Sequence, residues 1–365
     1  MSTRPIVLAL VIVAGALAPA SPATAATWSV VTTPNPAADS NRFHGIELRS
    51  SSSGWAVGSA GTRPLVARWN GSSWSSTSAF TQAGALNGVD GSADSNVWAV
   101  GATGSGTLTG RWNGGSWSVV PSPMPPGASD ATLRAVKVIG PADAWAVGDA
   151  AVGSQRRTHI VRWNGSTWAA VASPSPDPTQ NFLDAIEGSA NDLWAVGNLG
   201  HDGYGGGTVA GMVLRWNGTG WTRQTIPGAD STFSIIKLHD VAVLGAGNVM
   251  IVGEAFHRGL LRHVPYVLRW NGSSWQHATI PNPPTGSFQA VTAVSPTAVY
   301  AVGTRDGGRT FAARWNGSTW TQETTPASGY LMDAAATSTG TVLAVGVRYD
   351  SNWSARTLGL RGIHQ

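Results

Sequence analysis

The chain has 365 residues, a formal net charge of +4, only 12% charged residues and no cysteine. The absence of cysteine excludes disulfides, thiolate metal ligands and a cysteine nucleophile. Six arginines recur at one position of a repeat and are spread evenly, so they form no basic face, and we expect no nucleic-acid partner. A chain of this length can bury roughly three quarters of its surface, and a large core can replace disulfides.

Residues 1–25 have the features of a secretory signal peptide. Arg4 precedes an almost wholly apolar run over residues 6–18, and Ala23-Thr-Ala25 fits a small-residue cleavage site. The apolar run is well short of the ~20 residues that a membrane-spanning helix needs. We therefore expect cleavage near Ala25, a secreted protein and no membrane insertion.

From residue 28 onward, one pattern of three segments recurs seven times. A Leu-x-x-Val segment is followed by Trp-Ala-Val-Gly and then by Arg-Trp-Asn-Gly-x-x-Trp. Repeats of this length are typical of solenoids, propellers and arrays. The first position of the second segment is held in turn by Trp55, Trp98, Trp145, Trp194, Met250, Tyr300 and Leu343.

Each segment has the composition of a β-strand. Trp, Val, Ile and Thr dominate, and Gly, Asn, Ser and Pro separate the segments. The Asn-Gly pair predicts a hairpin with a type I′ turn, in which both central residues have positive φ. We name the four strands of a unit A (Leu-x-x-Val), B (Trp-Ala-Val-Gly), C (Arg-Trp-Asn) and D (x-x-Trp). Seven such units predict an all-β, seven-bladed β-propeller over residues 26–365.

The first strand of the chain completes the last unit. The C-terminal unit lacks a closing Trp segment, and Trp28-Ser-Val-Val-Thr-Thr-Pro matches the closing segment that begins at Trp117. A blade built from both ends of the chain closes the ring and leaves no unpaired edges between the first and last units.

The pattern over residues 28–365 resembles the Kelch repeat, in which a glycine-ended strand is followed by a turn, a Trp and a proline-rich link. The segment from Trp117 to Pro126 is very similar to that link. One glycine stands where Kelch repeats usually have two. The turn also resembles, more weakly, the Asp-box of sialidase-type propellers. The Kelch resemblance implies a propeller that often serves as a protein-interaction scaffold, and fold alone assigns no activity.

The tryptophans allow two interpretations. Eighteen indoles suit a carbohydrate-binding protein, since sugars stack on indoles, but seventeen of the eighteen occupy repeat positions. A residue that returns once per blade is expected to pack blade against blade. Trp353 is the exception, and we weigh exposure and burial equally for it. It lies between strands B and C of the last unit, beside Arg348, Tyr349 and Asp350.

Segment lengths vary on one face only. The B–C and D–A connections differ in length, and both emerge on the same face, which we call the loop face; function tends to reside on variable loops. The longest B–C connections belong to blades three, four and five. We predict them as loops that carry ligand-binding residues: Arg156, Arg157 and His159; His201, Asp202 and Tyr204; and Glu254, His257, Arg258, Arg262 and His263.

A second candidate site is the mouth of the central channel. Strand A is innermost, and the residue after its first Leu or Phe is polar in six of the seven units. The apolar spacing in strand A is three rather than two, so the direction of these side chains stays open. The seven residues are His44, Asn87, Arg134, Asp184, His239, Gln289 and Met332.

No catalytic or metal-binding motif is present in the sequence. Asp184 with His239, or Arg134 with a neighbouring histidine and Tyr204, would suit acid–base work if they converge. We expect no cofactor and no metal. The sequence favours a secreted, monomeric propeller that binds a glycan or cell-surface polymer on the loop face. Two alternatives stay open, a polysaccharide lyase or glycosidase at the channel mouth and an extracellular protein-interaction scaffold.

Overall fold

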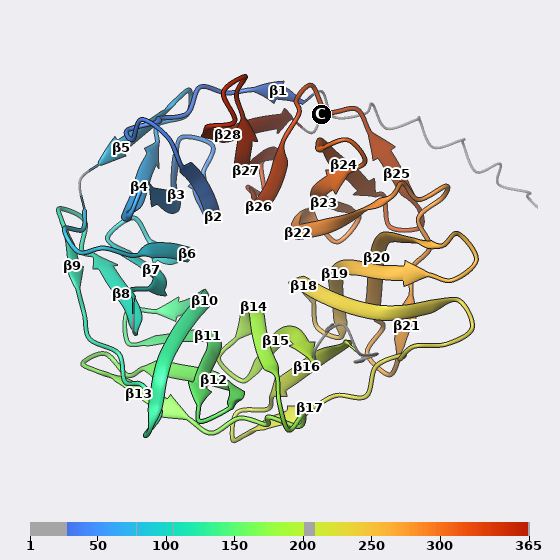
Figure 1. The fold of residues 1–365 in the computed structure, drawn as a ribbon, viewed down its shortest axis with the longest axis horizontal. Helices are drawn as coiled ribbons and strands as arrows, with labels where there is room; N and C mark the ends of the chain where they lie inside the picture. The colour runs from blue at the N-terminus through green and yellow to red at the C-terminus, as the bar shows by residue number, and fades with distance from the viewer. Residues whose placement is uncertain (1–27, 78, 105, 201–208, 364–365) are drawn as a thin grey trace, which may run out of the picture.

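A computed structural model describes residues 28–77, 79–104, 106–200 and 209–363. Within these residues, 28 strands form seven four-stranded antiparallel sheets around a central opening (Figure 1). The predicted all-β, seven-bladed propeller is confirmed. The predicted signal peptide, residues 1–25, lies outside the described residues. No helix in the described part of the chain is long and apolar enough to span a membrane.

The blades follow the chain in order, and each runs from strand A at the opening to strand D at the rim. Blade 1 is β2 (Asn41–Ser50), β3 (Ser53–Ala60), β4 (Arg63–Trp69) and β5 (Trp74–Thr77). Blade 2 is β6 (Ala85–Ala93), β7 (Asn96–Ala102), β8 (Thr107–Trp112) and β9 (Trp117–Val119). Blade 3 is β10 (Ala128–Gly140), β11 (Asp143–Val152), β12 (Gln155–Trp163) and β13 (Trp168–Val171).

The remaining blades repeat this order. Blade 4 is β14 (Asn181–Ser189), β15 (Asp192–Leu199), β16 (Ala210–Trp216) and β17 (Trp221–Arg223). Blade 5 is β18 (Phe233–Gly245), β19 (Asn248–His257), β20 (Arg262–Trp270) and β21 (Trp275–His277). Blade 6 is β22 (Gly286–Ser295), β23 (Ala298–Arg305), β24 (Arg309–Trp315) and β25 (Trp320–Glu323). Blade 7 is β26 (Tyr330–Ala336), β27 (Thr341–Tyr349), β28 (Ala355–Ile363) and β1 (Ser29–Val30).

The Asn-Gly hairpins form, but not as type I′ turns. In blade 1, Trp69 pairs with Trp74, which leaves a four-residue turn between them. The Oδ1 atom of Asn70 accepts bonds from the backbone N–H groups of Ser72 and Ser73 at 3.0 and 2.9 Å, and Gly71 has a φ of 99°. The prediction of positive φ at both central residues is wrong, because the Asn side chain closes the turn and only the glycine needs the left-handed region.

Tryptophans pack adjacent blades together. Fourteen of the seventeen repeat tryptophans are buried, and Trp112, Trp117 and Trp270 are half-buried. The ring of Trp98 in blade 2 lies 4.8 Å from that of Trp163 and 4.9 Å from that of Trp168 in blade 3. The same strand-B to next-blade contact recurs around the ring, so the interpretation of these indoles as core is confirmed.

The ring closes through the N-terminal strand, as predicted. Ser29 and Val30 of β1 pair with Arg361 and Leu360 of β28. In Figure 1 the blue N-terminal strand lies beside the red C-terminal strands. This blade therefore contains both ends of the described chain.

The prediction of long B–C loops in blades 3 and 5 is wrong. In blade 3, only residues 153–154 separate β11 from β12, and in blade 5 only residues 258–261 separate β19 from β20. The additional residues lengthen the ladders, because Gly153, with a φ of 61°, permits a tight turn after β11. Arg156, Arg157 and His159 consequently lie in β12, Glu254 and His257 in β19, and Arg262 and His263 in β20; Arg258 lies in the blade 5 turn.

Candidate functional site

Each innermost strand carries a β-bulge at the predicted channel-mouth position. In blade 1, Phe43 pairs with Gly58 and Gly45 with Val57, so His44 between them has no partner across the ladder. The corresponding residues of the other blades are skipped in the same way. A bulge re-aims the extra side chain, which explains the apolar spacing of three. The skipped residues are His44, Asn87, Arg134, Asp184, His239, Gln289 and Met332.

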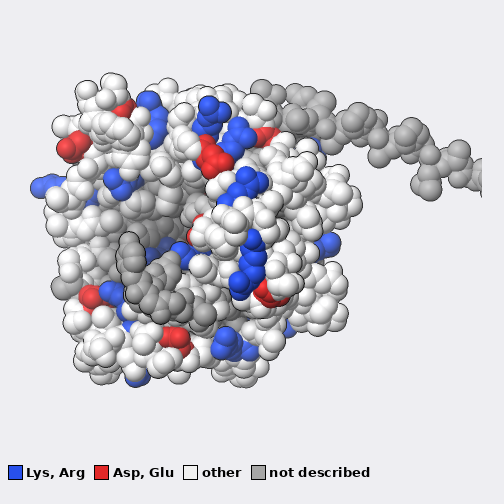
Figure 2. Space-filling model, turned by 45° about the vertical axis from the view of Figure 1, so that its right-hand side comes forward, with Lys and Arg blue, Asp and Glu red and all other residues white. Residues whose placement is uncertain are grey.

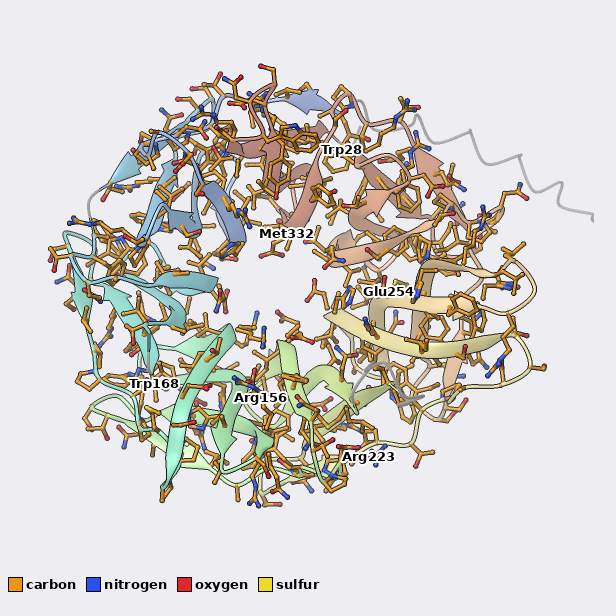
Figure 3. The ribbon with its side chains drawn as sticks, in the orientation of Figure 1. Trp28, Arg156, Trp168, Arg223, Glu254 and Met332 are labelled. Atoms are coloured by element: carbon orange, nitrogen blue, oxygen red, sulfur yellow. The ribbon has the colours of Figure 1, made fainter. Side chains whose placement is uncertain are left out.

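All seven of these residues line one central cavity of about 250 Å³. Figure 3 places Met332 at the edge of the central opening. The strand-B glycine opposite each bulge, such as Gly58, has no room for a Cβ, which would clash with a strand-A carbonyl oxygen. Glycine is therefore required at this repeat position, because the two strands approach closely. The bulges place the seven predicted residues around the wall of the channel.

Ring side chains join neighbouring blades. His44 and His239 each donate an imidazole N–H to a backbone carbonyl of the next blade, and Asn87 donates its amide N–H in the same way. These bonds satisfy polar groups inside the propeller. Burial also lowers the pKa of His44. The bonds are His44 Nδ1 to Leu86 O at 2.9 Å, Asn87 Nδ2 to Leu133 O at 2.8 Å and His239 Nδ1 to Phe288 O at 2.8 Å.

Two half-buried aspartates of the channel wall also join blades. Oδ2 of Asp333 in blade 7 accepts the backbone N–H of Ile46 in blade 1 at 2.8 Å, and Oδ2 of Asp240 accepts that of Val291 at 2.7 Å. Burial raises the pKa of Asp333 to about 7. Burial, and then the charge of Asp333, raises the pKa of Asp240 well above its usual range.

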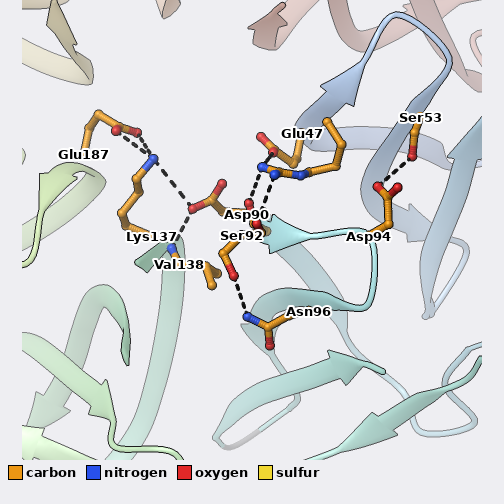
Figure 4. A network of polar contacts seen from close by, with 11 residues as sticks. Glu47, Ser53, Asp90, Ser92, Asp94, Asn96, Lys137, Val138 and Glu187 are labelled. Carbon is orange, nitrogen blue, oxygen red and sulfur yellow. Dashed lines mark hydrogen bonds and ion pairs between the residues drawn. The ribbon is translucent and has the colours of Figure 1, made fainter. Parts of the chain in front are cut away.

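A network of charged side chains connects blades 1 to 4 (Figure 4). Lys137 Nζ lies 2.7 Å from Glu187 and 3.8 Å from Asp90. Arg49 reaches Glu47 at 3.3 Å and donates to the carbonyl of Gly91 at 2.6 Å. Burial, and then the charge of Asp90, raises the pKa of Glu47 to about 8. These channel carboxylates hold the ring together, because each bonds to a neighbouring strand or cation.

The proposed acid–base pair of the channel is not assembled for proton transfer. Asp184 accepts a hydrogen bond from Asn198 at 2.9 Å and lies 3.5 Å from Arg134, and it shares no hydrogen bond with His239 in the described structure. Burial raises the pKa of Asp184, with the charges of Arg134 and His239 opposing. His201, Asp202 and Tyr204 lie outside the described residues.

Of the blade 3 candidates, Arg156 belongs to a chain of ion pairs around a buried aspartate. Asp149 is fully buried and accepts bonds from both Arg134, at 2.8 Å, and Arg156. Arg156 also lies 3.0 Å from Asp130. His159 is buried and its Nε2 bonds to the carbonyl of Pro123 at 3.0 Å. The prediction that these residues lie in a B–C loop is wrong, because they belong to β12. Arg156 and His159 have partners within the blade and its links.

The blade 5 candidates also contact other residues of the protein. Glu254 lies 3.6 Å from Lys237 and 4.0 Å from His263. The His257 ring packs against Phe233 with centroids 5.2 Å apart. Arg258 is exposed and donates to the carbonyl of Asp230 at 3.0 Å. These residues do not form one cluster with the blade 3 set.

The largest exposed aromatic group lies on blade 7, on the loop face. Tyr330 and Tyr349 are each 41% exposed and Trp353 is 83% exposed. The Tyr330 and Tyr349 rings lie 6.3 Å apart, and the Tyr349 and Trp353 rings 6.5 Å apart. Arg42 of blade 1 lies over the Tyr349 ring at 6.0 Å. We call Tyr330, Tyr349 and Trp353 the aromatic shelf.

A cavity of about 520 Å³ begins at the shelf and crosses blade 6 toward blade 5. We call it the rim pocket. Tyr330 and Met332 of blade 7 line one side of this pocket, and Glu254 of blade 5 lines the other. Figure 3 labels Met332 and Glu254 near the central opening. Gln289 and Met332 also line the central cavity, so the pocket opens beside the channel mouth. Its polar groups include Ser287, Gln289, Thr304, Arg305 and Asp306.

Sequence reasoning singled out Trp353 and placed it beside Tyr349, but it missed Tyr330. The chain has five tyrosines, and these two lie outside the repeat slots. Aromatic residues that break the repeat are the signal that would have found the shelf. No group of metal-ligating side chains occurs among the residues that the structure describes.

Known structures resemble this chain in fold. No protein-family model matches it, and no curated protein sequence matches it. The structure described as "YCF48 bound to D1 peptide" aligns with a TM-score of 0.59 and 14% identity, covering 93% of this chain and 96% of that one. U3-55K aligns with a TM-score of 0.59 and 10% identity over 92% and 98%. A protein of unknown function from Dyadobacter fermentans aligns with a TM-score of 0.51 and 11% identity over 94% and 99%. The neighbours are propellers of the WD40 and YCF48 kinds, and none of these comparisons supports a Kelch relationship.

Proposed function

We propose that this protein binds a glycan on its loop face, with the aromatic shelf as the stacking surface and the rim pocket as the polar part of the site. A β-propeller is a rigid scaffold on which such a platform can be displayed. The observation that carries the proposal is the exposure of three contacting aromatic side chains beside a cavity with several polar side chains in its lining. The predicted signal peptide is consistent with an extracellular polymer as the ligand.

The exposure of the shelf is costly, which favours a role in binding. Burial of a Trp side chain removes ~150–250 Å² from water. Trp353 is 83% exposed, so most of this hydrophobic stabilisation is absent. Single exposed apolar residues are ordinary, but adjoining ones mark interaction sites. Trp353 also has a φ of 59°, a backbone region that bulky residues rarely occupy.

The turn that carries Trp353 is well ordered by hydrogen bonds. The Oδ1 atom of Asp350 accepts the backbone N–H groups of Asn352 and Ser354 at 2.9 and 3.0 Å. The N–H of Trp353 donates to the carbonyl of Asp350 at 3.0 Å. The indole is thus held away from the core by a closed turn, and little ordering entropy would be lost on binding.

The rim pocket supplies the groups that hydroxyl-rich ligands need. Amide, hydroxyl and charged side chains line a space of about 520 Å³, within the usual range for small-ligand sites. Aromatic faces with a few placed polar groups suit sugar rings, which have apolar faces and polar edges. Figure 2 shows the hollowed centre of the ring with acidic and basic side chains around it.

The experiment is a glycan array probed with the wild-type protein and with Trp353→Ala/Tyr349→Ala. We expect the wild type to bind a restricted set of glycans and the double variant to lose them. The control is Val119→Ala, which removes a side chain that is 52% exposed on β9, away from the shelf. Unchanged binding by the shelf variant would show that the site lies elsewhere.

A protein ligand is the second candidate. The blade 5 turn exposes Leu260 and Leu261, at 44% and 78%, and adjoining exposed leucines suit a protein surface. One of the similar structures is described as "YCF48 bound to D1 peptide". Loss of partner capture in Leu260→Ser/Leu261→Ser, with capture retained by the shelf variant, would favour this function.

A further inference from the structure

We propose that the ligand of the shelf is an acidic glycan, whose carboxylate or sulfate groups are bound by Arg305, Arg309 and Arg348. This inference rests on the proposed function, because it assigns the chemical class of ligand to the same site. It comes from the charges that surround Tyr330, which the stacking argument does not use.

Two of these arginines face each other across a hairpin. Arg305 of β23 pairs directly with Arg309 of β24, and both are exposed. Like charges opposite one another on a sheet destabilise the hairpin. Neither has an ion-pair partner within the described part of the chain, so this pair remains an unneutralised concentration of positive charge.

The backbone of this hairpin contacts the start of β26. Gly308 accepts a hydrogen bond from the N–H of Gly329 at 2.7 Å, and Arg309 forms a bridge with Ser328. A Cβ at Gly308 would lie 3.5 Å from the hydroxyl of Tyr330. The arginine pair and the first ring of the shelf are consequently adjacent.

Arg348 lies beside the start of β26, within blade 7. It immediately precedes Tyr349 in β27, and a Cβ at Gly329 would lie 3.2 Å from the Cβ of Arg348. Arg348 is exposed, and the described residues give it no ion-pair partner. The opposing Arg356, its cross-strand partner, is neutralised by Asp350 at 2.9 Å.

The acidic residues nearby do not balance these charges. Asp306 and Glu254 line the rim pocket. Glu254 already lies within 4.0 Å of both Lys237 and His263. Within the described part of the chain, three arginines without an ion-pair partner therefore lie near one such carboxylate, that of Asp306. Guanidinium groups bind carboxylate and sulfate oxygens in a bidentate manner.

The test compares matched acidic and neutral polymers. Polygalacturonate is compared with its methyl ester, and dextran sulfate with dextran, so that each pair shares a polysaccharide backbone and differs in its acidic groups. We expect binding by at least one acidic polymer about tenfold or more tighter than by its neutral partner, equivalent to one well-formed charged hydrogen bond. Binding should weaken with salt, because exposed charges are screened. The two pairs distinguish carboxylate from sulfate as the recognised group.

Matched variants separate site recognition from general attraction. Arg305→Gln/Arg309→Gln/Arg348→Gln is compared with Arg63→Gln/Arg157→Gln/Arg223→Gln, which removes the same charge from blades 1, 3 and 4. We expect only the first to lose the tenfold preference, with melting temperatures of both near that of the wild type. Equal losses in the two variants would overturn the inference.

Three other outcomes would also overturn the inference, and each leads to a different conclusion. Equal binding of neutral and acidic polymers, abolished by Trp353→Ala/Tyr349→Ala, would retain the glycan site but reject its charge preference. Tight binding of poly-L-glutamate, which has no sugar rings, would show that the arginines bind acidic protein segments. Binding of acidic polymers that is insensitive to the shelf variant would reject the proposed function itself.

Discussion

The indole Nε1 of Trp28 donates a hydrogen bond of 2.6 Å to Oε2 of Glu323, a residue 295 positions further along the chain. Trp28 begins the segment that completes blade 7, whereas Glu323 ends the outermost strand of blade 6. The Trp28 ring also lies edge-on to Tyr300 of blade 6 at 6.4 Å. The first described residue thus joins the last two blades.

Removal of the closing segment should destabilise the whole ring. A chain that starts at residue 35 loses Trp28 and β1 and leaves β28 as an unpaired edge. Trp28→Ala alone should cost about 3–5 kcal/mol of unfolding free energy, as for other buried aromatics. Calorimetry on chains starting at residues 28 and 35 measures the effect, and identical melting curves would contradict closure by this segment.

Much of this architecture could be predicted from sequence because each blade repeats the same packing residues. The Trp segments determine the number of blades and their order, and the match between Trp28 and Trp117 predicts the closure. The bulges could not be predicted, because a ladder register depends on pairing between strands. The ion-pair partners of Arg156 could not be predicted either, since Asp149 and Asp130 become its neighbours only when β10, β11 and β12 pair.

Arg156 should matter for stability, in contrast to its neighbour Arg157. Arg156→Ala removes one of two cations that bind the fully buried Asp149, and a buried charged group that loses a partner costs about 1–3 kcal/mol or more. Arg157 is exposed, and its side chain bonds to that of Gln155 two residues away, so Arg157→Ala should change stability by less than about 0.5 kcal/mol. Urea denaturation of both variants tests this, and equal midpoints would contradict the assigned role of Arg156.

The channel aspartates should make the protein less stable as the pH rises. The pKa of Asp333 is about 7 in the folded protein and 3.8 in its unperturbed state. The folded protein therefore holds a proton that the unfolded chain releases, and this contribution to stability is present below about pH 4 and is lost as the pH rises through about 7.

Asp333→Asn isolates this effect, because it removes the titrating group and keeps the histidines whose own titration opposes it. The melting temperature of the variant relative to wild type should increase between pH 5 and pH 8. A difference that stays constant, or that falls with pH, would contradict the raised pKa of Asp333.

Trp353→Gly should separate binding from stability. Glycine adopts a φ near 59° without strain, whereas this backbone conformation costs other L-residues roughly 1–2 kcal/mol of stability. The variant should be as stable as wild type or more stable by up to about 1 kcal/mol, and Trp353→Ala should show no such gain. A clear loss of stability in Trp353→Gly would show that the indole packs against the protein instead of awaiting a ligand.

The most direct test of the glycan-binding shelf is the fluorescence of Trp353 during titration with the best-bound oligosaccharide from the array. This indole is 83% exposed, while the other tryptophans are buried or half-buried, so a sugar ring stacked on it should shift the emission to shorter wavelength. The account predicts a saturable shift in the wild type and none in Trp353→Phe, whose phenyl ring retains part of the affinity. The same shift in Trp353→Phe, or saturation of the wild type with no shift, would contradict it.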